Sequence, residues 1–411
     1  MGWAAAAASV VFAGCAANVP SLDRAAKATG SLSKSVEMSP LPPAGGTPDQ
    51  ATAHRPGKPV KVGLLLPLSG GGQAGLVAET MRKAAELAIT DLSAPHITLL
   101  VRDDKATPEG AEAATREVIA AGSEIILGPL FAKSVQAAAA AARPANVPVV
   151  AFSNDRQVAG GGVTLLSFLA EPEVARVIAH ATAQGKTRMA ALVPDDAYGR
   201  IVEAALRQSI ARDGGRIAAL ETYPIQANGM LDAVTRLRDA MRGIEEHGEP
   251  IQALFIAGGE DALAVLSPQI RQAGIDTRRI QVLGTGALDY ANAGRDPVLL
   301  GAWFAAPDPK GWKDFSDKYA RAHGHAPPRI ASLAYDAVAI AVALSSGPDG
   351  GRYIPSQLTR PSGFSGVDGH VRLTPEGLTD RALAVLEVQS FGAKVIDLPP
   401  ARAGEKVARV N

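Results

Sequence analysis

The sequence predicts an α/β fold of two doubly wound lobes, each built on a mainly parallel sheet. From residue 60 to residue 283, short apolar runs alternate with helical patterns, which is the order of βαβ units. The runs are continuously apolar, as expected for parallel strands that are covered on both faces. The alternation of strands and helices begins again near residue 171, and two lobes of similar size fit this repetition better than one very large sheet.

The expected elements follow one another regularly. In the opening helix, Val77, Met81, Ala84 and Ala88 share one face. The first half has strands at 62–66, 97–101, 124–127, 147–152 and 163–168, with helices at 77–92, 109–121 and 132–142. The second half has helices at 171–184, 197–213, 229–243 and 260–273, with strands at 188–193, 217–223, 253–257 and 281–283. Helices at about 310–323 and 330–345, a glycine-punctuated turn or crossover at 363–373 and a strand at 382–389 complete the pattern.

Composition excludes several classes of protein. The 411 residues contain 47% apolar residues, which permits a sizeable core. Lys plus Arg and Asp plus Glu each number 41, and this balance argues against a dedicated nucleic-acid binder. The single cysteine, Cys15, excludes a disulfide within the chain and any cysteine-based metal cluster.

The amino-terminal segment has the pattern of an export signal. An apolar run at 3–13 is too short to span a membrane and fits the core of a signal peptide. It ends in Val11-Phe-Ala-Gly-Cys15, which resembles the bacterial lipobox, although Phe12 stands where Leu is usual. The resemblance implies cleavage of residues 1–14 and lipidation of Cys15, which would anchor the chain to a membrane. The alternative is a buried thiol in a short helix.

The next segment, 15–58, is predicted to be a lipid-anchored flexible linker. Residues 16–58 contain no Phe, Trp or Tyr, and the twenty positions from Pro40 to Pro59 contain six prolines and three glycines. Such a stretch cannot bury enough apolar surface to offset the entropy lost on ordering.

Several motifs, in order, resemble the type 1 periplasmic binding proteins of the leucine-binding-protein family. They are Val60-Lys-Val-Gly-Leu-Leu-Leu-Pro-Leu-Ser-Gly70, Leu127-Gly-Pro-Leu130, Val147-Pro-Val-Val-Ala-Phe-Ser153, Asp195-Asp-Ala-Tyr-Gly199, Ala334-Tyr-Asp-Ala337 and Gly363–Leu373. The resemblance covers roughly 60–392. Three stretches, Leu64–Gly70, Leu127–Leu130 and Ala151-Phe-Ser-Asn-Asp155, also look like a narrower lipoprotein branch, whose members activate penicillin-binding proteins in cell-wall synthesis.

The resemblance implies two lobes that are joined by three crossovers and close on a ligand by hinge motion. On this sequence, lobe 1 maps to 59–168 and 306–365, lobe 2 to 169–305 and 366–396, and a tail to 397–411.

In the first lobe, the family pattern points to loops at the carboxyl ends of strands. Ser69 is expected to cap the first helix, beside an N-terminus open to polar ligand groups. Phe131, Ser153 and Asn154 match segments that hold an amino-acid carboxylate in the family, although Phe131 departs from the small residues often found there. Purely structural turn or cap roles remain open for Ser69 and Ser153.

In the second lobe, Tyr198, Glu260 and Thr285 follow the ends of predicted strands. Tyr198 matches a family position that often lines the ligand site, and Glu260 could pair with a ligand ammonium. Helix-start packing for Tyr198, a dipole-complementing role for Glu260 and a turn hydroxyl for Thr285 are the alternatives.

These observations predict a periplasmic lipoprotein that is not an enzyme and needs no cofactor or metal. Its expected partners are a small amino-acid-like ligand, an ABC transporter permease or a penicillin-binding protein, and a membrane through the lipid anchor, with no nucleic acid. Gly70–Gly75 contains a formal G-x-G-x-x-G. A dinucleotide site is disfavoured, because the acids that end the next strand lie about 30 residues on, whereas about 20 is usual.

Overall fold

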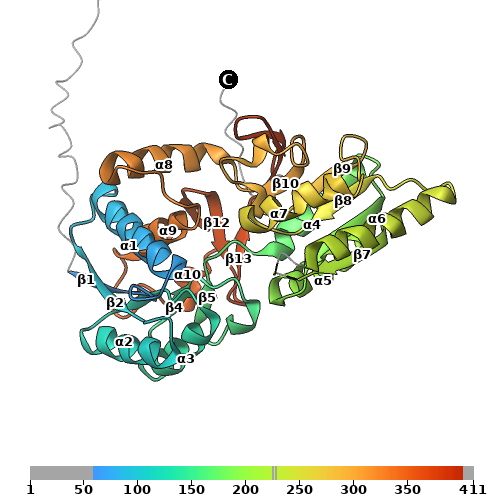
Figure 1. Cartoon of the computed structure of the whole chain (residues 1–411). Helices are drawn as coiled ribbons and strands as arrows, with labels where there is room; N and C mark the ends of the chain where they lie inside the picture. Colours follow the sequence, from blue (N-terminus) through green and yellow to red (C-terminus); the bar gives the residue numbers. More distant parts are fainter. Residues whose placement is uncertain (1–58, 225, 227–228, 401–411) are drawn as a thin grey trace, which may run out of the picture. The chain divides into compact units, whose positions relative to one another are not determined.

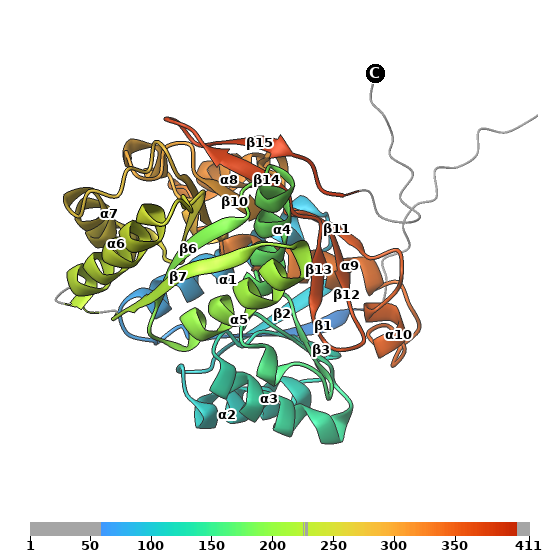
Figure 2. The ribbon, with the colours of Figure 1, turned by 90° about the vertical axis from the view of Figure 1, so that its right-hand side faces the viewer.

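The computed structural model describes residues 59–224, 226 and 229–400. In this part of the chain, two mainly parallel sheets are each flanked by helices, and a small antiparallel sheet is added (Figures 1 and 2). The two-lobed α/β fold expected from the sequence is therefore confirmed. The predicted signal peptide, the lipidated Cys15 and the linker lie outside the described residues.

The sheet of lobe 1 has five parallel strands in the order β2-β1-β3-β4-β5. They are β1 (Val60–Leu66), β2 (Ile97–Asp103), β3 (Ile125–Leu127), β4 (Val149–Ala151) and β5 (Val163–Leu165). Because the strands are parallel, the loops that follow them meet at one edge of the sheet, and this edge carries the lobe-1 candidates.

Helices cover both faces of this sheet, as the continuously apolar strands predict. One face packs against α1 (Gln73–Asp91), α8 (Pro309–His323) and α9 (Ala331–Leu344), and the other against α2 (Pro108–Ala120) and α3 (Ala132–Ala142). Figures 1 and 2 show α2 and α3 side by side. The alternate side chains of β1 divide between these cores: Leu64 faces α1 and α9, and Leu65 faces α2 and α3.

The sheet of lobe 2 has seven strands in the order β15-β14-β10-β9-β8-β6-β7. They are β6 (Arg188–Pro194), β7 (Arg216–Tyr223), β8 (Ala253–Ile256), β9 (Gln281–Gly284), β10 (Trp303–Ala306), β14 (Ala384–Val388) and β15 (Ala393–Asp397). The first five are parallel; β14 pairs antiparallel with β10, and β15 pairs antiparallel with β14 and so runs in the direction of the first five.

Lobe 2 is also covered on both faces. Helices α4 (Ala170–Ala183) and α5 (Ala197–Asp213) pack on one face, and α6 (Met230–Glu246) and α7 (Glu260–Gln272) pack on the other. The described chain passes between the lobes three times, after β5, after β10 and after the last strand of the small sheet.

The small sheet contains β11 (Phe364–Gly366), β12 (Gly369–Leu373) and β13 (Thr379–Arg381), and it follows the short helix α10 (Pro355–Leu358). Its side chains Val371 and Leu373 belong to the core of lobe 1, although the sequence mapping placed 366–396 in lobe 2. The chain returns to lobe 2 only after Arg381. The glycines at 363, 366 and 369 thus shape a hairpin, because β11 and β12 pair antiparallel across them.

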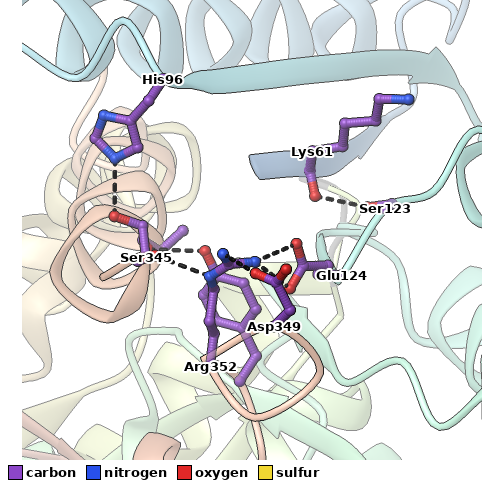
Figure 3. A network of polar contacts seen from close by, with 9 residues as sticks. Lys61, His96, Ser123, Glu124, Ser345, Asp349 and Arg352 are labelled. Atoms are coloured by element: carbon purple, nitrogen blue, oxygen red, sulfur yellow. Dashed lines mark hydrogen bonds and ion pairs between the residues drawn. The ribbon is translucent and has the colours of Figure 1, made fainter. Parts of the chain in front are cut away.

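A polar network closes the opposite edge of the lobe-1 sheet, where the strands begin (Figure 3). Arg352, from the segment between α9 and α10, lies between Glu124 and Asp349, and its Nε donates to the carbonyl of Ser345 (2.9 Å). The Ser345 hydroxyl contacts His96 Nε2 at 2.9 Å, just before β2. This network fastens the carboxyl end of α9 to the starts of β2 and β3.

Candidate functional site

The end of β6 positions a tyrosine over the lobe-2 sheet. Asp196 caps α5, because its carboxylate accepts the backbone N–H of Gly199 (2.7 Å). Gly199 is required here, since a Cβ at this position would lie 1.7 Å from the carbonyl oxygen of Pro194. This tight start explains the Asp195–Gly199 motif and fixes the direction of Tyr198.

Two predicted residues meet in lobe 2. The hydroxyl of Tyr198 lies 2.8 Å from Oγ1 of Thr285, which follows β9 and is 1% exposed. Burial, the leading cause, raises the pKa of Tyr198 to about 12, so the phenol is neutral at physiological pH. Thr285 also accepts the N–H of Ala287 in the short turn Gly286–Leu288, so its predicted turn role is present as well.

Tyr198 also lines a pocket of about 270 Å³ at the carboxyl ends of β6, β7 and β8, beside α6 and α7. The hydroxyl of the buried Tyr223, at the pocket wall, donates to the carbonyl of Ala257 (2.5 Å). The lining residues are Pro194, Asp196, Tyr198, Tyr223, Met230, Gly258, Gly259, Asp261, Ala262 and Val265. A mainly apolar pocket with a few polar groups at strand ends is the common form of a small-molecule site.

Glu260 does not line this pocket. It is the first residue of α7 and is exposed, while its neighbour Asp261 is a lining residue. An acid in the first turn of a helix complements the helix dipole, which accounts for the position of Glu260 without a ligand.

The lobe-1 candidates lie at the carboxyl edge of their sheet. Ser69 is not a helix cap, contrary to the expectation: Gly72 occupies that position before α1, without a capping side chain. Ser69 lies three residues earlier, where its backbone N–H donates to Asp103 Oδ1 (3.2 Å).

Ser153 is buried, and its hydroxyl accepts the N–H of Asp155 (3.2 Å) in a turn of its own, whereas Asn154 is exposed. Phe131 precedes α3 and is 39% exposed. The Leu127–Leu130 motif has a steric cause, because Gly128 has φ +91° and a Cβ there would meet the carbonyl oxygen of Leu65 at 2.1 Å.

A cluster of buried charges, not predicted from the sequence, occupies the crossover region. The guanidinium of Arg381 lies 3.7 Å from the carboxylate of Asp336 and 4.0 Å from that of Asp368. Asp368 also accepts the hydroxyl of Ser332 (2.6 Å) and lies 2.7 Å from Arg329. The signal available in the sequence was Asp336 itself, the one charged residue of α9.

This cluster reaches lobe 2 through Arg329, and a hydrogen bond within lobe 2 lies beside that contact. Arg329 lies 3.7 Å from Asp289, which follows the turn after Thr285. The buried carboxyl of Glu173, in the first turn of α4, accepts the N–H of Gly286 (2.8 Å). Burial raises the pKa of Glu173 to about 7. The Tyr198–Thr285 pair is therefore one residue away from a group held at the first crossover.

Among the described residues, no three or more His, Cys, Asp or Glu side chains are grouped so that they could hold a metal ion. No helix in the same part of the chain is long and apolar enough to cross a membrane.

Solved structures of bacterial binding proteins share the fold. A putative branched-chain amino acid ABC transporter protein from Rhodospirillum rubrum matches with a TM-score of 0.71 and 21% identity over 82% of this chain and 99% of that one. An ABC transporter substrate-binding protein from Desulfitobacterium hafniense in complex with Leu matches with a TM-score of 0.64 and 17% identity, over 82% of this chain and 99% of that one. A solute-binding protein from R. palustris in complex with 4-hydroxybenzoate matches with a TM-score of 0.64 and 15% identity, over 82% of this chain and 96% of that one.

At the level of sequence, no curated protein matches. The family model described as "Periplasmic binding protein" matches residues 59–393, which is most of the chain. The chain therefore belongs to the type 1 periplasmic binding proteins of the leucine-binding family, a family of extracytoplasmic solute-binding proteins.

Proposed function

We propose that this protein captures a small amino-acid-like solute for an ABC importer and carries out no chemistry. The observation that carries the proposal is the lobe-2 pocket, which lies at the carboxyl ends of parallel strands and includes Tyr198. Solved structures of the same fold hold leucine or hydroxybenzoate, which supports a ligand of this size. In this mechanism the three crossovers act as the hinge, and the ligand stabilises the closed arrangement.

Equilibrium binding tests the proposal. The full chain is heated with each of a panel of amino acids and aromatic acids, and a true ligand raises the melting temperature in a concentration-dependent manner. Replacing Tyr198 by Phe should weaken binding of that ligand, because the Tyr198–Thr285 contact is lost. The matched control is Tyr353→Phe, which removes a hydrogen bond to the carbonyl of Ala341 in lobe 1 and should leave the affinity unchanged. Equal effects of the two variants would contradict the assignment of the site.

Anchoring at Cys15 is the second part of the proposal. It rests on the lipobox-like Val11–Cys15 and on the Pro-rich segment that follows. Mass spectrometry of the protein from bacterial membranes should find a mature chain that starts at a lipidated Cys15. A chain that begins at Met1 with an unmodified thiol would exclude the anchor.

One observation favours an alternative, an interaction protein of the same fold that activates a penicillin-binding protein. The hydroxyl of Ser153 is engaged in its own turn, and Glu260 is exposed. Two residues that were expected to bind an amino acid therefore do not line the pocket. A flat thermal response across the solute panel, together with recovery of a penicillin-binding protein on the immobilised full chain, would favour this function over import.

A further inference from the structure

The lobe-2 pocket has room for a ring or a branched alkyl group. An apolar cavity of about 150 Å³ is enough to bind benzene, and this pocket measures about 270 Å³. Tyr223 and Met230 in its wall are buried, at 1% and 3% exposure, so the apolar surface is built into the fold. Val265 and Ala262 extend this surface along α7.

The charged groups of the lining have one sign. The charged residues are Asp196, which is partly buried, and Asp261, which is exposed, and the described lining contains no Lys, Arg or His. Among the described residues, the carboxylate of Asp196 accepts one hydrogen bond, from the N–H of Gly199, whereas an ionised carboxylate offers about four acceptor sites. Asp196 lines the pocket together with Tyr198 and Tyr223, and its charge adds to the burial that raises the pKa of both phenols.

The hydroxyl groups of the lining and the start of α7 do not cancel the negative charge of the pocket. The hydroxyl of Tyr223 donates its hydrogen bond to the carbonyl of Ala257, and the hydroxyl of Tyr198 is engaged with Thr285. Helix α7 begins at the pocket, and a free helix N-terminus carries roughly half a positive charge. Its first turn contains both Glu260 and Asp261, so the net charge at this end is negative.

We propose that this pocket binds a primary amine with an apolar body, a ring or a branched alkyl chain, and disfavours a carboxylate on the part of the ligand that enters it. The ammonium group pairs with Asp196 and Asp261, and the apolar body lies against Tyr223, Met230 and Val265. The inference rests on the proposed solute-binding function and narrows its ligand class.

Calorimetric titration of the full chain with matched probes tests the proposal. 2-Phenylethylamine and isoamylamine should bind at least about tenfold more tightly than 3-phenylpropionate and isovalerate, since a like charge beside the two carboxylates is unfavourable. In the double variant Asp196→Asn, Asp261→Asn, amine affinity should fall and the difference between amines and acids should disappear. Asparagine caps a helix about as well as aspartate, so α5 should keep its start. Equal binding of amines and acids by the unaltered protein would overturn the proposal.

A pocket-filling variant separates this inference from the proposed function. Val265→Phe should abolish amine binding, whereas Ala264→Phe, on an exposed neighbouring position of α7, should not, with urea unfolding as the check that both variants fold. If an amino acid binds and Val265→Phe leaves its affinity unchanged, the solute-binding function stands and the pocket inference fails. If amines bind only with Val265 intact and no amino acid binds, the pocket inference stands and amino-acid capture fails. If no probe binds, both fail.

Discussion

Two buried guanidinium groups in this protein are held in different ways. Arg352, at the starting edge of the lobe-1 sheet, donates from all three nitrogens: to Ser345, to both oxygens of Glu124 (2.6 and 2.8 Å) and to Asp349. Arg381, at the third crossover, has a side chain that is 4% exposed, yet none of its nitrogens makes a hydrogen bond to the described residues. Its neighbours are two carboxylates at 3.7 and 4.0 Å and the ring of Phe168 at 5.1 Å.

The difference matches the positions of the two residues in the fold. A network of short, directional hydrogen bonds fixes one geometry, and Arg352 joins elements of a single lobe that need no relative movement. Charge attraction and cation–π contact vary slowly with distance. Arg381 can therefore keep most of its stabilisation while the crossover changes its angle, as hinge closure requires.

The largest expected effect comes from breaking the rigid network. Arg352→Met should lower the free energy of unfolding by about 3–5 kcal/mol, because removal of one partner leaves the carboxylate of Glu124 and the carbonyl of Ser345 without their donors. Urea unfolding measures the loss. As a control, Arg116→Met removes an exposed i,i+4 pair with Glu112 and should cost no more than about 0.5 kcal/mol. A loss below about 1 kcal/mol for Arg352→Met would mean that the network is not structural.

The second effect should be smaller, about 2 kcal/mol for Arg381→Met. No hydrogen bond is lost, methionine fills most of the volume, and Arg329 remains paired with Asp368. Asp336 loses its nearby cation, but it keeps the N–H of Val367, and because burial raises its pKa it can take up a proton instead of remaining as an unpaired buried charge. The same urea series compares the two arginines directly. If Arg381→Met destabilises as much as Arg352→Met, the distinction between a bonded and a merely charge-balanced guanidinium is wrong.

Much of the fold was predictable because its signals are local. Helix α5 has the predicted bounds, since Asp196 caps its start and Gly214, in the left-handed conformation, ends it. At 363–373 the predicted alternatives were a turn or a crossover, and the structure has the turn of a hairpin. The third crossover was placed too early because strands of three to five residues carry little periodicity, and a hairpin and a crossover use the same glycines. The charge cluster was missed because Asp336 and Arg381 are 45 positions apart, and no local pattern reports their meeting.

The third prediction concerns the pH dependence of the free energy of unfolding, which we assign to Glu173 at the first crossover and not to the Arg352 network. Because the pKa of Glu173 rises from an ordinary 4.5 to about 7, the folded state holds a proton that the unfolded state has released. The stabilisation is complete below about pH 4.5 and is lost as pH rises through about 7. Arg329 opposes the upward shift, and Glu171 and Asp289 add to it.

We expect Glu173→Gln to remove about 1 kcal/mol of the fall in unfolding free energy between about pH 6 and pH 8. Glutamine keeps an oxygen for the N–H of Gly286 and does not titrate, so the variant should lose this part of the pH dependence without losing that hydrogen bond. Urea unfolding at both pH values measures the difference. Arg352→Met serves as the comparison and should keep the pH dependence of the unaltered protein. An unchanged slope in Glu173→Gln would contradict burial as the origin of the effect.

The smallest expected effect concerns the neutral pair that touches the pocket. A double-mutant cycle of Tyr198→Phe and Thr285→Val should give a coupling energy of about 0.5–1.5 kcal/mol, the range of an ordinary hydrogen bond between uncharged groups. Repeating the cycle with saturating ligand sharpens the comparison between the two lobes. Since Gly286 joins Thr285 to Glu173 at the first crossover, a coupling energy that grows with ligand bound would tie the pocket to the hinge. If the coupling energy is the same with and without ligand, the Tyr198–Thr285 pair only stabilises lobe 2, as the Arg352 network stabilises lobe 1.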